Sequence, residues 1–332
     1  MRTSIFVALL ASIVVMANTA VRASDKVTFV LDWIPSGEEP YPYVATKEGF
    51  FAEEGLDVTI RVGRGSTDTI TKLATGTAEF GAGSVGALLG AKAESRDPVA
   101  VKAILSMYCK QADAIFTVKG TGIQTLKDLA GHTVATAPAS SSNVVWPVIA
   151  KANGLDTSKI TLVKADPGAL FPMLATGRAD ATISWVTNKA SAQLVLSQVG
   201  KELVILPWSD YGFEGYGLSL FATDKIIKEQ PQLVARFLRA YTKAINFTFD
   251  HPEAAAKDNH DMIPEVSAED GYKEWSNSAP LIKNEVSAKY GMWTFDPGLL
   301  KTTWEWVAKG QNYPVDKIDP ESAVDRSFIP KH

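Results

Sequence analysis

The sequence predicts an α/β protein of two domains with largely parallel sheets. Short strand-like runs alternate with helical runs up to about residue 245, which is typical of βαβ architectures. A chain of 332 residues is also longer than one hydrophobic core usually serves. Finally, "LATGTAEFGAGS" at 73–84 aligns with "LATGRADATISW" at 174–185, and in both a helix end precedes an acidic residue and a strand. This echo indicates two similar lobes.

The first elements follow from local patterns. "KVTFVLDW" (26–33) and "LDVTIRVG" (56–63) predict strands, and "YVATKEGFFAEEG" (43–55) between them predicts a short helix that ends in a turn at a glycine. "STDTITKLATG" (66–76) predicts a helix capped by Ser66 or Thr67.

The second half changes character. "AEFGAGS" (78–84) is the next predicted strand, and the alternation continues through the middle of the chain. From "PQLVARFLRAY" (231–241) onward the pattern is predominantly helical, and "PGLLKTTWEWVAKGQ" (297–311) predicts the last helix.

The N-terminal segment has the pattern of a secretory signal peptide. Arg2 precedes an apolar run over 5–17, and small residues lead to Ala23. The apolar run is shorter than the roughly 20 residues that cross a bilayer. We therefore expect residues 1–23 to be removed after about Ala23 and the mature protein to be periplasmic.

Charge and cysteine content exclude some classes. Removing residues 1–23 takes away two of the 33 basic residues and none of the 37 acidic ones, so the net charge becomes −6. This composition lacks the basic footprint of a nucleic-acid partner. Cys109 is the single cysteine, so no intramolecular disulfide forms, and we expect it to be a buried small hydrophobe.

The stretch "EFGAGSVGALLG" (79–90) permits three interpretations. Gly81, Gly83 and Gly86 match the G-x-G-x-x-G spacing of dinucleotide-binding turns. Ser84 also lies in an A-x-S-x-G variant of the nucleophile elbow of serine hydrolases. The third interpretation is a strand that runs into a helix and presents a small hydroxyl to a binding cleft.

The second copy of the echo favours the third interpretation. Neither the glycine spacing nor the elbow recurs there, and the next strand lacks the carboxylate that a dinucleotide site requires. A hydrolase centred on Ser84 would need a histidine partner, but His132 follows a predicted surface turn, and His251 and His260 lie in a polar helical segment. We expect no cofactor and no metal, and we keep the hydrolase as an alternative.

Several motifs resemble a known family. "FVLDWIPSGEEPYPYVATKEGFFAEEGLDVTI" (29–60), "ITKLATGTAEFGAGS" (70–84), "IQTLKDLAGHTVAT" (123–136) and "TDKIIKEQPQLVARFLRAY" (223–241) resemble the periplasmic solute-binding proteins of ABC importers. The most similar group binds nitrate, alkylsulfonates, taurine and pyrimidine precursors of thiamine. The enzyme branch of this family uses a cysteine-rich motif, which a chain with one cysteine lacks.

The resemblance implies a type II periplasmic binding protein fold. Two α/β lobes, each a mostly parallel sheet flanked by helices, would be joined by two crossing strands and would close on a ligand. Lobe one would comprise 25–112 plus 217–332, and lobe two 113–216. The crossings would lie near 111–118 and 215–222. The implied partners are a small-molecule ligand and an ABC import permease, and the protein would be a monomer.

Open α/β sheets bind ligands at the carboxyl ends of their strands, and helix starts there offer free backbone N–H groups. On this rule, Ser84 and Trp185 would face each other across the cleft. The complete set of expected ligand-binding residues is Trp33, Glu38, Glu39, Tyr41, Ser66, Thr67, Ser84, Tyr108, Ser140, Ser141, Asn143, Trp185, Asn188 and Tyr211.

Two signals compete over the ligand. Arg64, beside the turn 65–67, could form an anion nest for nitrate or a sulfonate. Glu38 and Glu39, with aromatic residues at the strand ends, instead suit a flat nitrogen heterocycle or a cation. We expect an aminopyrimidine-like ring, with one of the two glutamates facing inward and the other solvated.

The resemblance bears on the ligand too. "LDWIP" (31–35) resembles the thiamine-pyrimidine binders more than the sulfonate binders. Those binders typically have Asn-His where this chain has Glu38 and Glu39, and they tend to carry an acidic residue soon after the position of Asn188.

Overall fold

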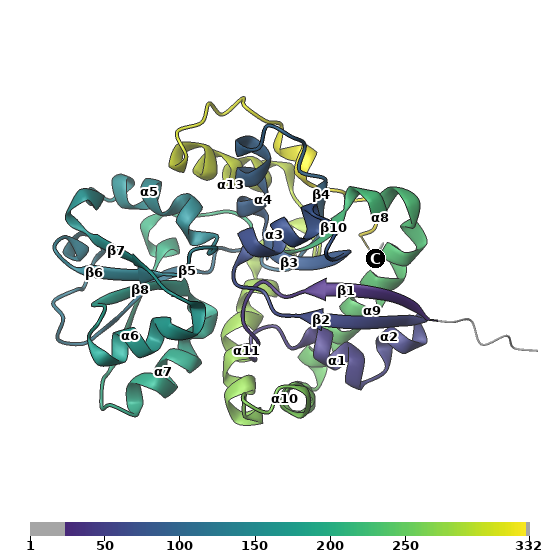
Figure 1. Ribbon diagram of the computed structural model, residues 1–332, viewed down its shortest axis with the longest axis horizontal. Helices are drawn as coiled ribbons and strands as arrows, with labels where there is room; N and C mark the ends of the chain where they lie inside the picture. The colour runs from purple at the N-terminus through teal and green to yellow at the C-terminus, as the bar shows by residue number, and fades with distance from the viewer. Residues whose placement is uncertain (1–23, 330–332) are drawn as a thin grey trace, which may run out of the picture.

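The computed structural model describes residues 24–329, so the expected signal peptide lies outside the described residues. It contains two five-stranded sheets, which stand side by side in Figure 1. We call the first sheet with its helices lobe one, and the second lobe two. The first sheet has the spatial order β2 (Leu56–Arg61), β1 (Asp25–Val30), β3 (Phe80–Ser84), β10 (Leu218–Thr223), β4 (Val101–Ser106). The second has the order β7 (Thr161–Lys164), β6 (Thr133–Thr136), β8 (Ala181–Trp185), β5 (Asp113–Val118), β9 (Leu203–Pro207).

Each sheet is mostly parallel, with one reversed strand. In lobe one, β10 runs antiparallel to both β3 and β4. In lobe two, β5 runs antiparallel to both β8 and β9. The chain passes from the first sheet to the second between β4 and β5 and returns between β9 and β10. The reversed strands are thus the first strand after each crossing.

Helices cover both sheets (Figure 1). Those before β4 are α1 (Tyr41–Lys47), α2 (Phe50–Glu53), α3 (Ser66–Ala74) and α4 (Val85–Glu94). Lobe two contributes α5 (Ser142–Ala152), α6 (Leu170–Thr176) and α7 (Lys189–Ser197), with short 3₁₀ turns η1 (Leu126–Leu129), η2 (Thr157–Lys159), η3 (Pro167–Ala169), η4 (Val186–Asn188) and η5 (Trp208–Tyr211). The predicted helical tail is α8 (Asp224–Glu229), α9 (Pro231–Asp250), α10 (Pro252–Met262), α11 (Ala268–Ile282), α12 (Glu285–Tyr290), α13 (Pro297–Gly310) and η6 (Pro320–Ala323).

The two similar sequence segments, 73–84 and 174–185, also have similar structures. Both copies join a helix to a central strand, α3 to β3 and α6 to β8, through glycines with φ of 73° and 72°. Left-handed backbone of this kind favours glycine. The acidic residue that follows accepts a hydrogen bond from a backbone N–H of the neighbouring parallel strand: Glu79 from Thr28 at 2.7 Å, and Asp180 from Thr133 at 2.8 Å. The same device therefore fixes strand register in both lobes.

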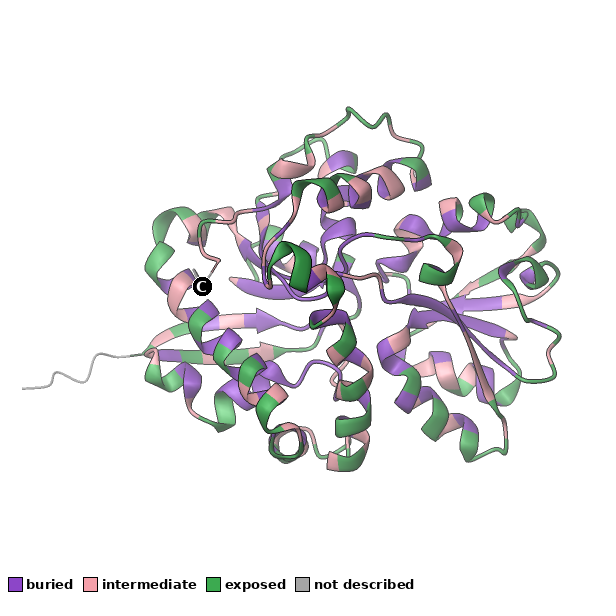
Figure 2. Cartoon of the chain, turned by 180° about the vertical axis from the view of Figure 1, so that it is seen from behind, coloured by how far each residue is buried: buried purple, intermediate pink, exposed green. Residues whose placement is uncertain are grey.

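Buried residues run through the sheets and the facing sides of the helices in both lobes (Figure 2), and large aromatic side chains are among them. Phe80 stacks on Phe237 with ring centroids 4.0 Å apart in lobe one, and Trp146 stacks on Trp208 at 5.6 Å in lobe two. The Cys109 thiol is buried, as expected. Between residues 24 and 329, no helix is long and apolar enough to cross a membrane.

Two local predictions are wrong. The first strand ends at Val30 and not at Trp33, because the chain leaves the sheet to form the loop that precedes α1. The N-cap of helix α3 is Gly65, and Ser66 and Thr67 are the first two residues of the helix itself. The Ser66 hydroxyl is engaged elsewhere, since it donates to Asp32 and accepts from the backbone N–H of Ser84.

Candidate functional site

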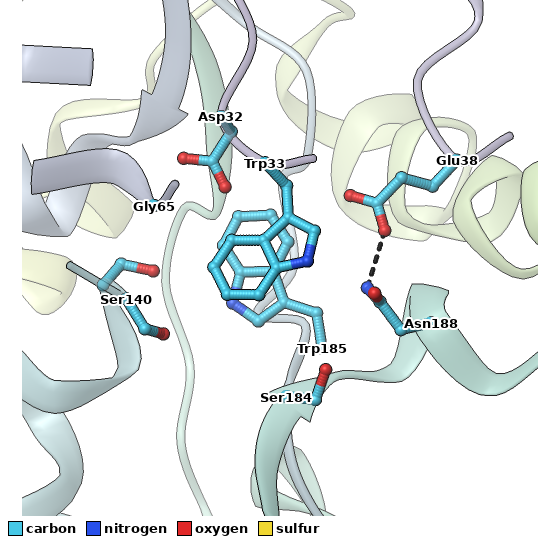
Figure 3. A pocket seen from close by; sticks show the side chains of 9 residues that line it. Asp32, Trp33, Glu38, Gly65, Ser140, Ser184, Trp185 and Asn188 are labelled. Atoms are coloured by element: carbon cyan, nitrogen blue, oxygen red, sulfur yellow. Dashed lines mark hydrogen bonds between the residues drawn. The ribbon is translucent and has the colours of Figure 1, made fainter. Parts of the chain in front are cut away.

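A cavity lies between the lobes, at the carboxyl ends of strands from both sheets (Figure 3). The space among its lining atoms, part of which is open to solvent, is about 300 Å³. Lobe one contributes the loops that follow β1 and β2, and lobe two contributes the loop before α5 and the end of β8. Its lining residues are Asp32, Trp33, Glu38, Gly65, Ser140, Ser141, Ser184, Trp185 and Asn188.

Asp32 is a buried carboxylate of lobe one that lines the cavity. Its carboxylate is 4% exposed and accepts a hydrogen bond from the Ser66 hydroxyl at 2.5 Å. The Ser66 oxygen is fixed in turn by the N–H of Ser84 at 2.9 Å. Burial raises the pKa of Asp32 to about 7, and the nearby Asp113 adds to this rise.

Glu38 faces the opposite lobe. Its Oε2 accepts a hydrogen bond from Nδ2 of Asn188 at 2.7 Å, drawn in Figure 3. The side chain is 4% exposed, and burial raises its pKa to about 7. Asn188 ends η4 directly after β8, so this contact ties a strand end of lobe two to the loop of lobe one.

Glu39 points the other way and corrects one expectation. Its Oε1 accepts a hydrogen bond from the hydroxyl of Tyr241 on α9 at 2.9 Å. The residue is buried inside lobe one and not solvated, because α9 and α1 cover it. Burial raises its pKa well above the usual range, with the charges of Asp32 and Glu38 adding to the rise. Glu38 is thus the glutamate that lines the cavity.

Two tryptophans from different lobes line the same cavity. Trp33 lies on the loop after β1, and Trp185 is the last residue of β8. Figure 3 shows their indoles one behind the other, with Asp32 and Glu38 at the edges. Tyr108 packs behind Trp185 with ring centroids 6.1 Å apart. A flat ring placed here would meet aromatic faces and carboxylates at its rim.

The cavity carries unbalanced negative charge. The ion pairs of residues 24–329 involve none of Asp32, Glu38 and Asp113. A buried carboxylate without a cation is costly unless hydrogen-bond donors surround it. Thr187 and Asn188 of lobe two donate to Glu38, but no cation does among residues 24–329, so the site favours a ligand rich in N–H groups or positively charged.

The lobes are closed around this cavity. Gly65 makes the closest approach: a Cβ there would lie 2.2 Å from the carbonyl oxygen of Ala139 in lobe two, and its φ of 129° also favours glycine. Further contacts between the lobes join Glu38 to Asn188, the N–H of Thr67 to the carbonyl of Ala139, Arg64 to Asp166, and Ser191 to Glu274.

A family model described as "NMT1/THI5 like" matches residues 41–255, about two thirds of the chain. The chain belongs to the NMT1/THI5-like family. The alkanesulfonate-binding protein SsuA from Xanthomonas axonopodis pv. citri, solved bound to MOPS, superposes with a TM-score of 0.69 over 92% of this chain and 100% of that one. At 14% identity, this likeness shows the fold, which is that of periplasmic binding proteins.

Curated relatives of this NMT1/THI5-like protein include binders and enzymes. The formylaminopyrimidine-binding protein of Halalkalibacterium halodurans is 26% identical over 70% of this chain and 69% of its own. The riboflavin-binding protein RibY of Chloroflexus aurantiacus is 24% identical over 92% and 86%. The yeast enzyme 4-amino-5-hydroxymethyl-2-methylpyrimidine phosphate synthase THI13, from Saccharomyces cerevisiae, is 23% identical over 76% of each chain.

The structure also settles the glycine-rich stretch of this family member. Gly81 and Gly83 have no left-handed backbone; a Cβ at Gly81 would lie 2.6 Å from Thr69 on α3, and one at Gly83 2.7 Å from Phe221 on β10. The spacing therefore serves close packing around β3. Ser84 ends β3 and occupies the N-cap position of α4 without a side-chain capping bond, which confirms only the strand-to-helix part of the third interpretation. No hydrogen bond joins its hydroxyl to a histidine of the described residues.

Six of the fourteen expected binding residues line the cavity: Trp33, Glu38, Ser140, Ser141, Trp185 and Asn188. Ser84 lines a separate pocket and does not face Trp185. Ser66 does not line the cavity, but its hydroxyl donates a hydrogen bond to Asp32, which does. The others lie elsewhere: Tyr41 and Tyr108 fully buried in lobe one, Glu39 beside Tyr241, Thr67 exposed, Asn143 bonded to Thr136 and Lys164, and Tyr211 packed in lobe two.

The side chain of Arg64, on which the alternative anion nest depends, does not reach the cavity. The guanidinium of Arg64 lies outside the cavity, with its side chain 69% exposed, and pairs with Asp166 at 3.1 Å. Sequence reasoning missed Asp32, Gly65 and Ser184. The strand-end rule would have found Asp32 if the first strand had been ended at Val30, since Asp32 then falls in the loop.

Proposed function

We propose that this NMT1/THI5-like protein is an extracytoplasmic solute-binding protein for a small nitrogen heterocycle, which it delivers to an ABC import permease. The observation that carries the proposal is a pair of buried carboxylates without a cation, Asp32 and Glu38, at the edges of two tryptophans from different lobes. An aminopyrimidine offers flat faces for the indoles and N–H donors for the carboxylates.

In the proposed complex, the ring lies between Trp33 and Trp185. Asp32 and Glu38 accept hydrogen bonds from amino or ring N–H groups at its edge, and the serine hydroxyls of lobe two bond its remaining polar atoms. The formylaminopyrimidine-binding relative supports a ligand of this class. Closure then removes the ring from water, and pairing with donors offsets the cost of burying the carboxylates.

We further propose that 25–112 plus 217–332 and 113–216 move as two bodies, with export directed by residues 1–23 and a monomer as the working unit. In this arrangement Gly65 and Asn188 separate from their partners when the cleft opens. The permease would recognise the closed form, as expected for an importer-linked binding protein.

The proposal includes binding without turnover. No histidine of the described residues bonds the Ser84 hydroxyl to act as its general base. The imidazoles instead contact residues that do not line the cavity: His132 contacts Asp180, His251 contacts Phe247, and His260 contacts Val266. Cys109, the single thiol, is buried, and burial raises its pKa, which disfavours the reactive thiolate.

A thermal-shift screen tests the proposal, because a ligand that binds only the folded state raises the melting temperature. The screen contains pyrimidines, other amines, taurine, alkylsulfonates and nitrate. We expect stabilisation by a pyrimidine, and recovery of that molecule unchanged by mass spectrometry. Stabilisation by the anions alone, lost in Arg64→Ala and kept in Glu38→Gln, would make this an anion-binding protein. A changed product that Ser84→Ala abolishes would make it an enzyme.

A further inference from the structure

A second cavity lies next to the first and is not used by the proposed ring. It lies between α4, α5 and α13, and we call it the inner pocket; the space among its lining atoms, part of which is open to solvent, is about 260 Å³. Its polar lining consists of Ser84, Gln111, Asp113 and Ser141, and Val145 and Phe213 belong to its apolar wall. These residues come from both lobes and from the segment that joins β4 to β5.

The inner pocket adjoins the ring site. Ser141 lines both cavities. Asp113 and Trp185 are directly paired across β5 and β8, and paired residues on one face of a sheet have Cβ atoms about 4.5–5.5 Å apart. The charge of Asp113 also acts on Asp32 in the ring site. A group held one or two bonds away from a ring on Trp185 would therefore reach the inner pocket.

The polar atoms of the inner pocket are incompletely satisfied. Asp113 is 5% exposed, and its Oδ1 accepts a hydrogen bond from the Ser142 hydroxyl at 2.5 Å. The indole N–H of Trp185 and the backbone N–H of Asp113 also donate toward the carboxylate, but no cation of residues 24–329 pairs with it. The hydroxyl of Ser84 has no partner in that range, although the residue is 6% exposed. The pocket thus offers a free hydroxyl beside a carboxylate that has hydrogen-bond donors but no cation.

This chemistry matches an ammonium group. Burial raises the pKa of Asp113 to about 6, so the carboxylate is largely ionised at pH 7.5. A protonated primary amine has three donors and no acceptor, and Asp113, Ser84 and Ser141 supply three oxygens. A charge-assisted hydrogen bond to the carboxylate would be the strongest of these contacts.

We propose that the inner pocket is a subsite for a protonated amino group that the ligand carries on a short linker from its ring. This inference rests on the proposed function, because the ring must occupy the space beside Trp185. The preferred ligand is accordingly a ring with an aminomethyl-like substituent, and a methyl or hydroxymethyl group in the same place leaves the Asp113 charge unpaired.

Calorimetric titration at pH 7.5 with three probes tests the subsite. The probes are 4-amino-2-methylpyrimidines that carry methyl, hydroxymethyl or aminomethyl at ring carbon 5. The wild-type protein should bind the aminomethyl probe at least about 10-fold more tightly than the methyl probe, since only the former pairs Asp113. Asp113→Asn should bring this ratio close to one and change the affinity for the methyl probe less than about threefold, because an amide carbonyl still accepts from Ser142.

Two further variants keep the test decisive. Ser84→Ala removes the unpartnered hydroxyl and leaves the Asp113 carboxylate in place, so it should lower the ratio about threefold and decides the matter if Asp113→Asn does not fold. Asp97→Asn, an exposed carboxylate outside both cavities, should leave the ratio unchanged.

The outcomes separate the two proposals. If Glu38→Gln weakens all three probes but neither Asp113→Asn nor Ser84→Ala changes their ratio, the ring site stands and the amino subsite is refuted. A wild-type protein with no preference for the aminomethyl probe refutes the subsite as well. If none of the three probes binds, the proposed function fails together with this inference.

Discussion

Lobe one presents carboxylates to the cleft, whereas lobe two presents hydroxyl and amide groups. Asp32 and Glu38 come from the loop after β1, and Ser140, Ser184 and Asn188 come from the facing edge of the second sheet. Both lobes nevertheless contain the same helix–strand junction, with its glycine and its acidic residue. The shared scaffold therefore fixes where side chains stand, and the loops that follow the strands decide what the site can bind.

The largest effect should come from removing a charge of lobe one. Glu38→Gln should weaken binding of the pyrimidine ligand on the order of 30- to 1000-fold, equal to about 2–4 kcal/mol, because ring donors lose an ionised acceptor. Calorimetric titration measures the change. Its neighbour Glu39→Gln is the matched control, since Glu39 bonds Tyr241 and does not line the cavity, and it should change affinity less than about threefold.

The approach of the two lobes should be the next most sensitive feature. Gly65→Ala places a Cβ against the carbonyl of Ala139 only when the lobes are closed, so the affinity should fall on the order of 10-fold. Gly76→Ala is its control: φ is 73° there, and no atom lies within 4 Å of the added Cβ. We expect that variant to lose stability and keep its affinity. Equal losses of affinity in both would show that backbone strain, and not closure, matters.

The ligand-free protein should become less stable as its lobe-one carboxylates ionise. Burial raises the pKa of Asp32 from 3.8 to about 7 and that of Glu38 from 4.5 to about 7. Folding therefore takes up protons between about pH 4 and 7, so the free energy of unfolding falls as the pH rises through this window. Melting temperatures should decline from pH 5.5 to 8. A double variant Asp32→Asn with Glu38→Gln should show a flatter profile; an unchanged slope would assign the effect to other groups.

The smallest effect should come from the exposed ion pair between the lobes. Arg64 and Asp166 have side chains 69% and 55% exposed, and such pairs contribute about 0–1 kcal/mol. Arg64→Ala should therefore reduce pyrimidine affinity no more than about threefold, as measured by titration at two salt concentrations. A loss of 100-fold would mean that the arginine contacts the ligand, contrary to the acid-lined site.

The two-lobed fold was predictable because the sequence patterns that indicate it are local. The repeated helix–strand junction, the alternation of elements and the helical tail each depend on residues close in sequence. The strand-end rule likewise placed Trp33, Glu38 and Trp185 in the cleft.

The remaining site residues depend on contacts that are distant in sequence. The direction of Glu39 is set by Tyr241, which follows it by 202 positions, and no local pattern indicates that hydrogen bond. The sequence predicted Ser66 as a helix cap. Its hydroxyl instead donates a hydrogen bond to Asp32 and accepts one from the N–H of Ser84, because the sheet brings both residues close to it. Tyr41 and Tyr108 are core residues because α9 and Trp185 cover them, which the sequence does not reveal.

The most direct test of the acid-lined site compares two small ligands of opposite character in the wild-type protein. Calorimetric titration at pH 7.5 should give binding of 4-amino-5-hydroxymethyl-2-methylpyrimidine at least about 100-fold tighter than binding of taurine, because buried carboxylates accept N–H donors and repel a sulfonate. Taurine binding more tightly than the pyrimidine would contradict the account.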